Sequence, residues 1–163
     1  MAVQKVVTYG HSALRAISKN ITDFSKIRSL IDDLFDTMYE FDGIGLAANQ
    51  IGINKRIFVV DISHTEECES PLVFINGKII NGDGSCVDSE GCLSLPGHFA
   101  EIERPAECQI KFIDYNGKEK ELKANGLLAT CIQHEIDHLD GILYPERMLN
   151  LRQFGFVDEL EEH

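Results

Sequence analysis

The sequence predicts an α+β fold in which mixed or antiparallel β-sheets pack around a central helix that carries an H-E-x-x-H motif, with a second helix nearer the N-terminus. Two helical segments and the short apolar runs between them predict this class. Apolar residues recur at helical spacing in residues 27–38, and Leu127, Cys131 and His134 share one face of a later segment. Between these segments, short apolar runs are separated by turn dipeptides, as in antiparallel sheets.

The first helix is predicted by apolar residues at positions i, i+3, i+4, i+7, i+8 and i+11 from Ile27 to Met38. Ser25 is the expected N-cap, and Gly43 follows the expected end. A small-residue loop should run from 43 to 52, because its glycines and alanines have no helical or alternating pattern. Residues 56–61 then form an apolar run that predicts a buried strand.

The remaining elements follow from turn signals and from short patterns of alternating residues. Asn-Gly dipeptides predict turns, and Gly, Ser and Asp in a cluster predict irregular structure. The predicted elements are, in order, a strand or strand pair at 71–76 and 78–80 broken at Asn76-Gly77, an irregular segment at 81–97, a hairpin of 108–112 with 118–123 around Asn116-Gly117, and a helix at about 126–139 with Gly141 beyond its end.

The length and amino-acid composition limit the classes of function that this chain can have. The 163 residues suit one domain with a real core. They include 15 basic and 27 acidic side chains, a net charge of −12, so we expect no direct binding of nucleic acid or of an anionic membrane. No apolar run reaches the roughly 18 residues of a membrane span, and no secretory signal is visible. The five cysteines form no C-x-x-C pair, which favours reduced thiols in the cytoplasm.

The strongest chemical signal is the segment His134-Glu135-Ile136-Asp137-His138. Two histidines at i and i+4 project from the same helical face, close enough to bind one cation. Glu135 is rotated by about 100° from His134, which suits a general base acting on metal-bound water. The longer metzincin motif is excluded, because Tyr144 stands where its third histidine would be.

The third ligand decides which kind of metal site this is. Cys92 lies in Glu90-Gly-Cys-Leu-Ser94, and a Cys/His/His set would leave a fourth position open for water. A downstream carboxylate would instead give a small zinc metallopeptidase, with Glu146, Asp158 and Glu159 as the candidates. A third possibility is a non-catalytic module in which the metal only stabilises the fold. Such a site needs a fourth protein ligand, and the only candidates are His64 and Cys68.

The small-residue loop formally matches G-x-G-x-x-A from Gly43 to Ala48. We reject a dinucleotide site, because the loop follows a helix and precedes a strand, the reverse of the order that such a site needs. The better interpretation is backbone that lines a narrow cleft, with Gln50 presenting an amide N–H to an oxyanion.

Three segments together, Gly43-Ile-Gly-Leu-Ala-Ala-Asn-Gln50, Glu90-Gly-Cys-Leu-Ser94 and Gln133-His-Glu-Ile-Asp-His138, resemble the three signature motifs of the peptide deformylase family in order and separation. The resemblance implies a single catalytic domain with one divalent metal per chain, Fe²⁺ in preference to Zn²⁺, Ni²⁺ or Co²⁺. It makes Cys92, His134 and His138 the metal ligands and Glu135 the general acid/base.

The same resemblance implies the reaction and its remaining site residues. The substrate would be the N-formylmethionyl end of a nascent polypeptide, and hydrolysis would release formate. The Gln50 side chain and the Leu93 backbone N–H would stabilise the oxyanion, and Gly45 would offer backbone hydrogen bonds to the substrate. The residues expected around the methionine side chain are Ile44, Leu127 and Cys131.

Four positions depart from the family's common pattern. Asn49 should change only the stiffness of its loop. Asp88 and Thr130 stand where many members have aliphatic residues, so they should alter the size and polarity of the side-chain pocket. Phe99 replaces a substrate-contacting arginine, which should weaken or rearrange binding of the peptide backbone. The acidic tail at about 150–163 lacks the basic extension of some bacterial members, so any ribosome association should be transient.

Overall fold

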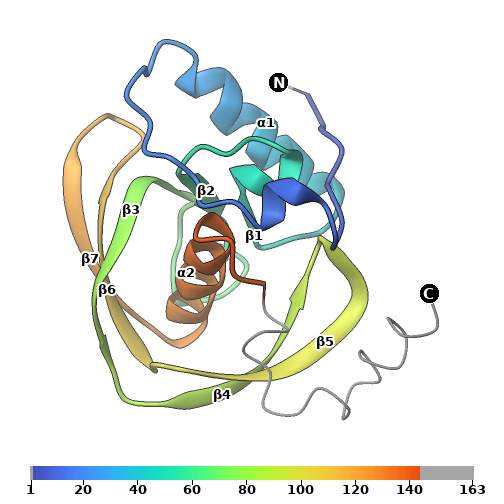
Figure 1. Ribbon diagram of the computed structural model, residues 1–163. Coiled ribbons are helices and arrows are strands. Elements are labelled where there is room, and N and C mark those ends of the chain that lie inside the picture. The colour runs from blue at the N-terminus through green and yellow to red at the C-terminus, as the bar shows by residue number, and fades with distance from the viewer. Residues whose placement is uncertain (1, 144–163) are drawn as a thin grey trace.

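The computed structural model describes residues 2–143, so the predicted acidic tail lies outside them. The expected α+β class is confirmed, with antiparallel sheets and two α-helices (Figure 1). No helix in the described part of the chain is long and apolar enough to cross a membrane. The elements are η1 (Ser12–Leu14), α1 (Ile27–Glu40), β1 (Gly45–Ala47), η2 (Ala48–Ile51), β2 (Ile57–Val60), β3 (Leu72–Asp83), β4 (Cys86–Cys92), β5 (Leu95–Arg104), β6 (Glu107–Ile113), β7 (Glu119–Asn125) and α2 (Gly126–Leu139).

The larger sheet has five strands in the order β1-β2-β3-β6-β7, and every neighbouring pair is antiparallel. β2 is apolar throughout because both of its faces are covered. Ile57 and Val59 belong to the cluster that packs on α1, whereas Phe58 and Val60 belong to the cluster that packs on α2. The period of two along a strand thus divides the core into two layers, one on each side of the sheet.

Of the strand or strand pair predicted around Asn76-Gly77, the single strand is the one present, since β3 continues through this dipeptide from Leu72 to Asp83. The pairing register with β6 shifts between Ile75 and Lys78, as at a β-bulge. Asn76 adopts a positive φ of 54°, and its side-chain amide exchanges two hydrogen bonds with the backbone of Ile21. The Asn-Gly signal therefore marks a bulge held by a distant segment instead of a turn.

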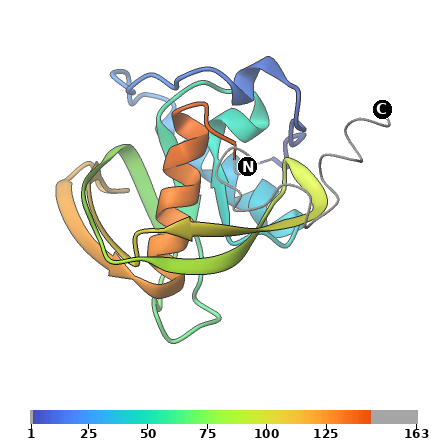
Figure 2. The ribbon, with the colours of Figure 1, turned by 60° about the horizontal axis from the view of Figure 1, so that its bottom comes forward.

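The segment at 81–97 is mostly strand, and the irregularity predicted there is found within β4 as a register shift between Gly91 and Cys92. Most of it forms β4 and the start of β5, a two-stranded antiparallel sheet paired from Cys86↔Arg104 to Cys92↔Leu95. Figures 1 and 2 show this pair passing across α2, separate from the larger sheet. Its inner face carries Glu90 and Ile102, both buried. Pairing with a partner strand supplied the order that the Gly, Ser and Asp composition did not predict.

The first helix is present where it was predicted, but the residues that cap its two ends are different ones. Its N-cap is Lys26, without a side-chain cap, while Ser25 donates its backbone N–H to Asp23. At the other end Asp42 has a positive φ of 56°, and the N–H of Gly43 donates to the carbonyl of Met38. Asp42, instead of Gly43, therefore supplies the left-handed residue that closes the helix.

The second helix is confirmed at 126–139 and lies inside the ring of strands (Figure 1). Every residue from Leu128 to Leu139 is buried. Its first turn is closed by Glu67, whose carboxylate accepts the N–H of Leu127 at 2.8 Å. Its last turn is held by the N–H of Ser18, which donates to the carbonyl of Leu139 at 2.7 Å. Contacts from distant segments at both ends fix the position of this helix.

Candidate metal centre and active site

The three predicted ligands come together at the junction of β4 and α2. The Sγ atom of Cys92 lies 3.2 Å from Nε2 of His138, and the Nε2 atoms of His134 and His138 lie 3.1 Å apart. All three donor atoms fall within 4.8 Å of one another. Cys92 is the last residue of β4, and the histidines are one helical turn apart on α2.

This donor set fits a divalent transition metal. His134 Nδ1 lies 2.9 Å from the carboxylate of Glu90, so Nδ1 donates to Glu90 and Nε2 is the atom that faces the other two donors, where the neutral ring would coordinate a metal. Two imidazole nitrogens and a sulfur that converge in this way are the ligands that Zn²⁺ and Fe²⁺ accept. Among residues 2–143 the group has three members. Three protein ligands are what catalytic metal sites typically have, since the fourth position is kept for water or substrate.

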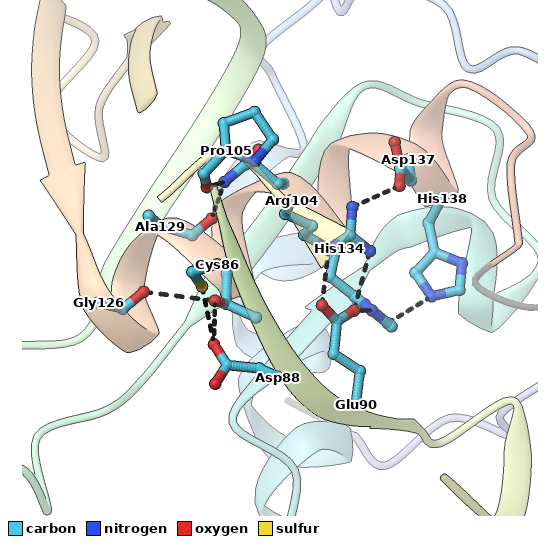
Figure 3. A network of polar contacts seen from close by, with 12 residues as sticks. Cys86, Asp88, Glu90, Arg104, Pro105, Gly126, Ala129, His134, Asp137 and His138 are labelled. Carbon is cyan, nitrogen blue, oxygen red and sulfur yellow. Dashed lines mark hydrogen bonds and ion pairs between the residues drawn. The ribbon is translucent and has the colours of Figure 1, made fainter. Parts of the chain in front are cut away.

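A buried ion network orients His134 (Figure 3). Arg104 of β5 donates two hydrogen bonds to Glu90, at 2.7 and 2.9 Å, and a third to Asp137 of α2 at 2.8 Å. Glu90 in turn bonds to His134. The network thus ties both strands of the small sheet to the helix that carries the histidines. Sequence reasoning missed the roles of Glu90, Arg104 and Asp137, although two of these residues lie inside the motifs.

The network sets the charge state of its members. Burial alone would raise the pKa of Glu90, but the hydrogen bonds from His134 and Arg104 outweigh it and lower that pKa. Burial likewise opposes the thiolate of Cys92, yet the nearby charge of His138 and the hydrogen bonds from both histidines hold the pKa of this thiol well below its usual value. The site therefore favours the thiolate, which is the form that binds a metal.

The cluster opens into a cavity of about 630 Å³. All the predicted site residues line it except His138, which lies behind the wall and is 1% exposed. The predicted residues that line the cavity are Ile44, Gly45, Gln50, Cys92, Leu93, Leu127, Cys131, His134 and Glu135.

Glu135 lines this cavity and has one buried carboxylate oxygen without a hydrogen-bond partner in the described part of the chain. This oxygen is Oε1, and burial raises the pKa of the carboxyl group. Gly45 makes room for it, because a Cβ at position 45 would lie 2.8 Å from Oε2 of Glu135. A carboxylate whose pKa is raised in this way is a better proton acceptor than an exposed one, as a general base must be.

The amide of Gln50 is held in a fixed orientation at the edge of the cluster. Its Oε1 accepts the N–H of Ala47 at 3.0 Å, so its Nε2 points toward Ser94 Oγ at 3.2 Å and Cys92 Sγ at 3.5 Å. An N–H aimed beside the sulfur is in position to donate to an oxyanion there. Ser94 is a further contact that sequence reasoning did not single out.

Asn49 has more than the predicted effect on loop stiffness. It is fully buried, and its Nδ2 donates to the backbone carbonyl of His138 and, at 3.5 Å, to that of Ala13. Asn49 therefore connects η2, which carries Gln50, to the end of α2 and to η1. The prediction that Asn49 matters only for the loop is wrong.

Thr130, which lines the cavity, is hydrogen-bonded to Asp88, an exposed residue that is not among the lining residues. Thr130 lines the cavity, and its hydroxyl lies 3.3 Å from Oδ2 of Asp88, which also accepts from Cys86 Sγ at 3.3 Å. Figure 3 shows Cys86 and Asp88 on the strand that faces the first turns of α2. The two polar residues that replace aliphatic ones therefore compensate each other, because the hydroxyl of Thr130 donates a hydrogen bond to the carboxylate of Asp88.

Comparison with known proteins identifies the family. The family model described as polypeptide deformylase matches residues 3–154. The chain is also 48% identical over 164 residues to the peptide deformylase of Pelagibacter ubique (strain HTCC1062), covering 99% of this chain and 95% of that protein. The chain belongs to the polypeptide deformylase family. The resemblance of the three motifs is thereby confirmed.

Solved structures of deformylases share the fold. A peptide deformylase from Legionella pneumophila superposes with a TM-score of 0.90 at 36% identity and covers 99% of this chain and 95% of its own. One from Synechococcus elongatus in complex with actinonin gives a TM-score of 0.88 at 39% identity, with 98% of this chain and 85% of that chain covered. The α+β architecture is therefore that of the deformylases.

Family membership favours the deformylase interpretation over the metallopeptidase. The carboxylates considered for a peptidase site, Glu146, Asp158 and Glu159, lie outside the described residues, as does Tyr144. His64 and Cys68 are not part of the ligand group found in residues 2–143, so the hypothesis of a metal that only closes the fold gains no support there.

Proposed function

We propose that this chain is a metal-dependent hydrolase that removes the N-terminal formyl group from formylmethionyl nascent polypeptides and releases formate. The observation that carries the proposal is the cavity into which two clustered metal-ligand side chains, the Glu135 carboxylate and the Gln50 amide all project, in a member of the deformylase family. Cys92, His134 and His138 would hold one divalent metal. Such a metal, when bound, supplies a Lewis acid that makes water nucleophilic at neutral pH.

The protein's own groups would then handle the proton and the developing charge. Glu135 accepts a proton from the attacking water and delivers it to the methionine nitrogen as the bond between that nitrogen and the formyl carbon breaks. Its buried position supports this role, because burial raises its pKa toward the working pH. Gln50 Nε2 and the Leu93 backbone N–H donate to the oxygen that gains negative charge.

The substrate's methionine side chain would lie against the apolar part of the wall. Ile44, Leu127 and Cys131 line the cavity there, and an unbranched thioether adapts to irregular apolar space. Gly45 would offer its backbone to the formyl group or to the extended peptide. Thr130, whose hydroxyl already has an acceptor in Asp88, would narrow this pocket without leaving a buried polar group unpaired.

Four further points belong to the proposal. The metal is Fe²⁺, with Zn²⁺, Ni²⁺ and Co²⁺ as alternatives that the donor set also accepts. Residues 1–163 act as one catalytic domain in the cytoplasm, where formylated chains emerge. Contact with the ribosome is transient, because a net charge of −12 disfavours a lasting attachment to an RNA surface. For the same reason we propose no direct binding of nucleic acid or membrane.

The direct test is formate release from a formyl-Met-Ala peptide by protein purified and loaded with iron without oxygen. Glu135→Gln should keep the metal and lower kcat by at least about 100-fold, since the proton carrier is removed. Glu121→Gln, the same change at an exposed position of β7, should keep full activity. No formate from protein of confirmed metal content would overturn the proposal.

Cys92→Ser separates the deformylase from the peptidase hypothesis. Loss of the thiolate should lower metal content after dialysis, together with formate release, because one of three protein ligands is weakened. Unchanged metal content in this variant, combined with cleavage of internal peptide bonds, would favour a peptidase that uses a downstream carboxylate.

A further inference from the structure

The N-terminal segment touches both loops that carry the proposed oxyanion donors. Residues 4–9, here called the strap, run from α1 to the turn between β4 and β5 (Figures 1 and 2). The N–H of Val7 donates to the backbone carbonyl of Gln50 at 2.7 Å. The N–H of Tyr9 donates to the backbone carbonyl of Ser94 at 2.8 Å. One short stretch of backbone therefore holds η2 and the β4–β5 turn at the same time.

The same two loops also contact each other directly, which closes a ring of hydrogen bonds. Gln50 Nε2 lies 3.2 Å from Ser94 Oγ and donates to it, and both residues are buried. The ring has three hydrogen bonds, two made by the strap and one made by the Gln50 amide itself. Leu93 precedes Ser94 in the turn. Both groups proposed to donate to the oxyanion therefore belong to the ring or lie directly beside it.

The strap limits how far the two loops can separate. Its two donors are two residues apart, and a fully extended chain advances at most about 3.6 Å per residue, so the N–H groups of Val7 and Tyr9 lie at most roughly 7 Å apart. Planar peptide units leave this length little freedom to change. The carbonyls of Gln50 and Ser94 cannot move apart without breaking a hydrogen bond to the strap.

Further contacts attach the strap at each of its ends. The N–H of Gln4 donates to Oγ1 of Thr37 at 2.8 Å, and its side-chain amide donates to Asp33 at 3.2 Å. Both acceptors belong to α1. At the other end the N–H of His11 donates to the carbonyl of Thr8 at 3.0 Å, where the chain turns into η1. These contacts give the strap a defined position against the two loops.

We propose that Val7 and Tyr9 are positioning residues for the reaction, an inference that rests on the proposed deformylase function. Their backbone N–H groups set the spacing between the two oxyanion donors, the Gln50 amide and the Leu93 N–H. Neither Val7 nor Tyr9 is among the residues that line the cavity, so they act through the loops. Donors aimed at a developing charge act in the transition state, so a loss of this spacing lowers kcat and leaves KM nearly constant.

The experiment replaces each donor by proline, which has no backbone N–H. Tyr9→Pro and Val7→Pro should keep the metal and lower kcat for formyl-Met-Ala by about tenfold, less than the 100-fold or more that outright loss of an oxyanion donor costs. Tyr9→Ala loses the same ring but keeps the N–H, so the difference between the two variants at position 9 isolates the hydrogen bond. Thr8→Pro puts proline between the two donors and leaves both N–H groups in place, and it should keep kcat.

A double variant separates positioning from a general loss of structure. In a Gln50→Ala background one oxyanion donor is already gone, so Tyr9→Pro should lower kcat further by less than about threefold. A merely structural role would give the full tenfold loss in either background. That result would overturn the inference, as would an unchanged kcat in both proline variants, loss of their metal, or an equal loss of kcat in Thr8→Pro.

Thr37→Val decides the question if the proline variants do not fold. Valine keeps the shape of threonine but removes the acceptor for the Gln4 N–H, which loosens the strap where it meets α1. Its kcat should fall about threefold at constant KM, with metal content unchanged. An unchanged kcat would then overturn the inference. No formate from the unaltered, metal-loaded protein would instead overturn the proposed function.

Discussion

Arg104 offers the sharpest test of how the site is held, because a single guanidinium supports two carboxylates in the interior. The side chains of Arg104 and Glu90 are only 5% and 4% exposed, and Asp137 bonds to the same guanidinium. Arg104→Met keeps most of the side chain's length but removes the charge. Both carboxylates would then lose the one buried guanidinium that bonds to both of them.

The expected loss follows from this burial. Removing one partner of a buried ion pair costs about 3–5 kcal/mol, because the remaining charge is left uncompensated. For a chain of this size that corresponds to a fall of roughly 6–20 °C in Tm. The control is Lys120→Met, which breaks an ion pair with Asp114 whose lysine side chain is 55% exposed. That loss should be only about 0–1 kcal/mol, since solvent screens the pair.

The assay is urea unfolding of metal-free protein followed by circular dichroism, so that loss of metal does not contribute to the difference. Adding Glu90→Gln to Arg104→Met should recover part of the stability, because it removes one of the two buried carboxylates that lost the guanidinium. The reasoning is refuted if Arg104→Met lowers the free energy of unfolding by less than about 1 kcal/mol. It is also refuted if Glu90→Gln destabilises the Arg104→Met variant by as much as it destabilises the unaltered protein.

Three smaller predictions concern contacts outside this network. Asn49→Leu removes two hydrogen bonds to carbonyls that have other donors, so it should lower the free energy of unfolding by only about 1 kcal/mol. Its kcat should nevertheless fall several-fold at constant KM, because the segment that carries Gln50 is no longer tied to α2. An unchanged kcat would contradict this. Glu67→Ala removes the acceptor for the Leu127 N–H in the first turn of α2 and should cost about 1 kcal/mol in urea unfolding, with formate release unchanged. The hydrogen bond from Lys120 and two backbone N–H groups lower the pKa of Asp114, so its contribution to stability is present above the unfolded pKa of about 3.9 and is lost as pH falls through the lower folded value. Asp114→Asn should therefore be less stable than the unaltered protein at pH 7, and the difference should close below about pH 4.

Much of the fold could be predicted because its signals are local. The periodicity of residues 27–38 and the Asn116-Gly117 turn each depend on neighbours a few positions away, and both elements are present where expected. Local signals were insufficient where distant partners decide. Asn76-Gly77 is a turn signal by composition, but hydrogen bonds to Ile21 hold it as a bulge inside β3.

The candidate site shows the same division between local and distant signals. His134, Glu135 and His138 are placed by the helical period alone, and the motif around Cys92 supplies the third donor. Nothing in the sequence shows that Arg104 would cross to Glu90 and Asp137, because the charges are 14 and 33 residues away from it in the chain. The sequence equally does not show which side chains line the cavity, since Phe41 and Phe99 come to it only after folding.

The sequence by itself determined the family, the donor set and the reaction class that they imply, because these depend on which side chains are present and on short spacings along a helix. Tertiary structure alone decided how His134 is oriented, how Gln50 is tied to α2 through Asn49, and which side chains surround the cavity. These depend on burial and on pairing between distant segments. A buried charge needs a partner that the fold brings close to it, and the separation of two residues along the chain does not indicate whether they will meet.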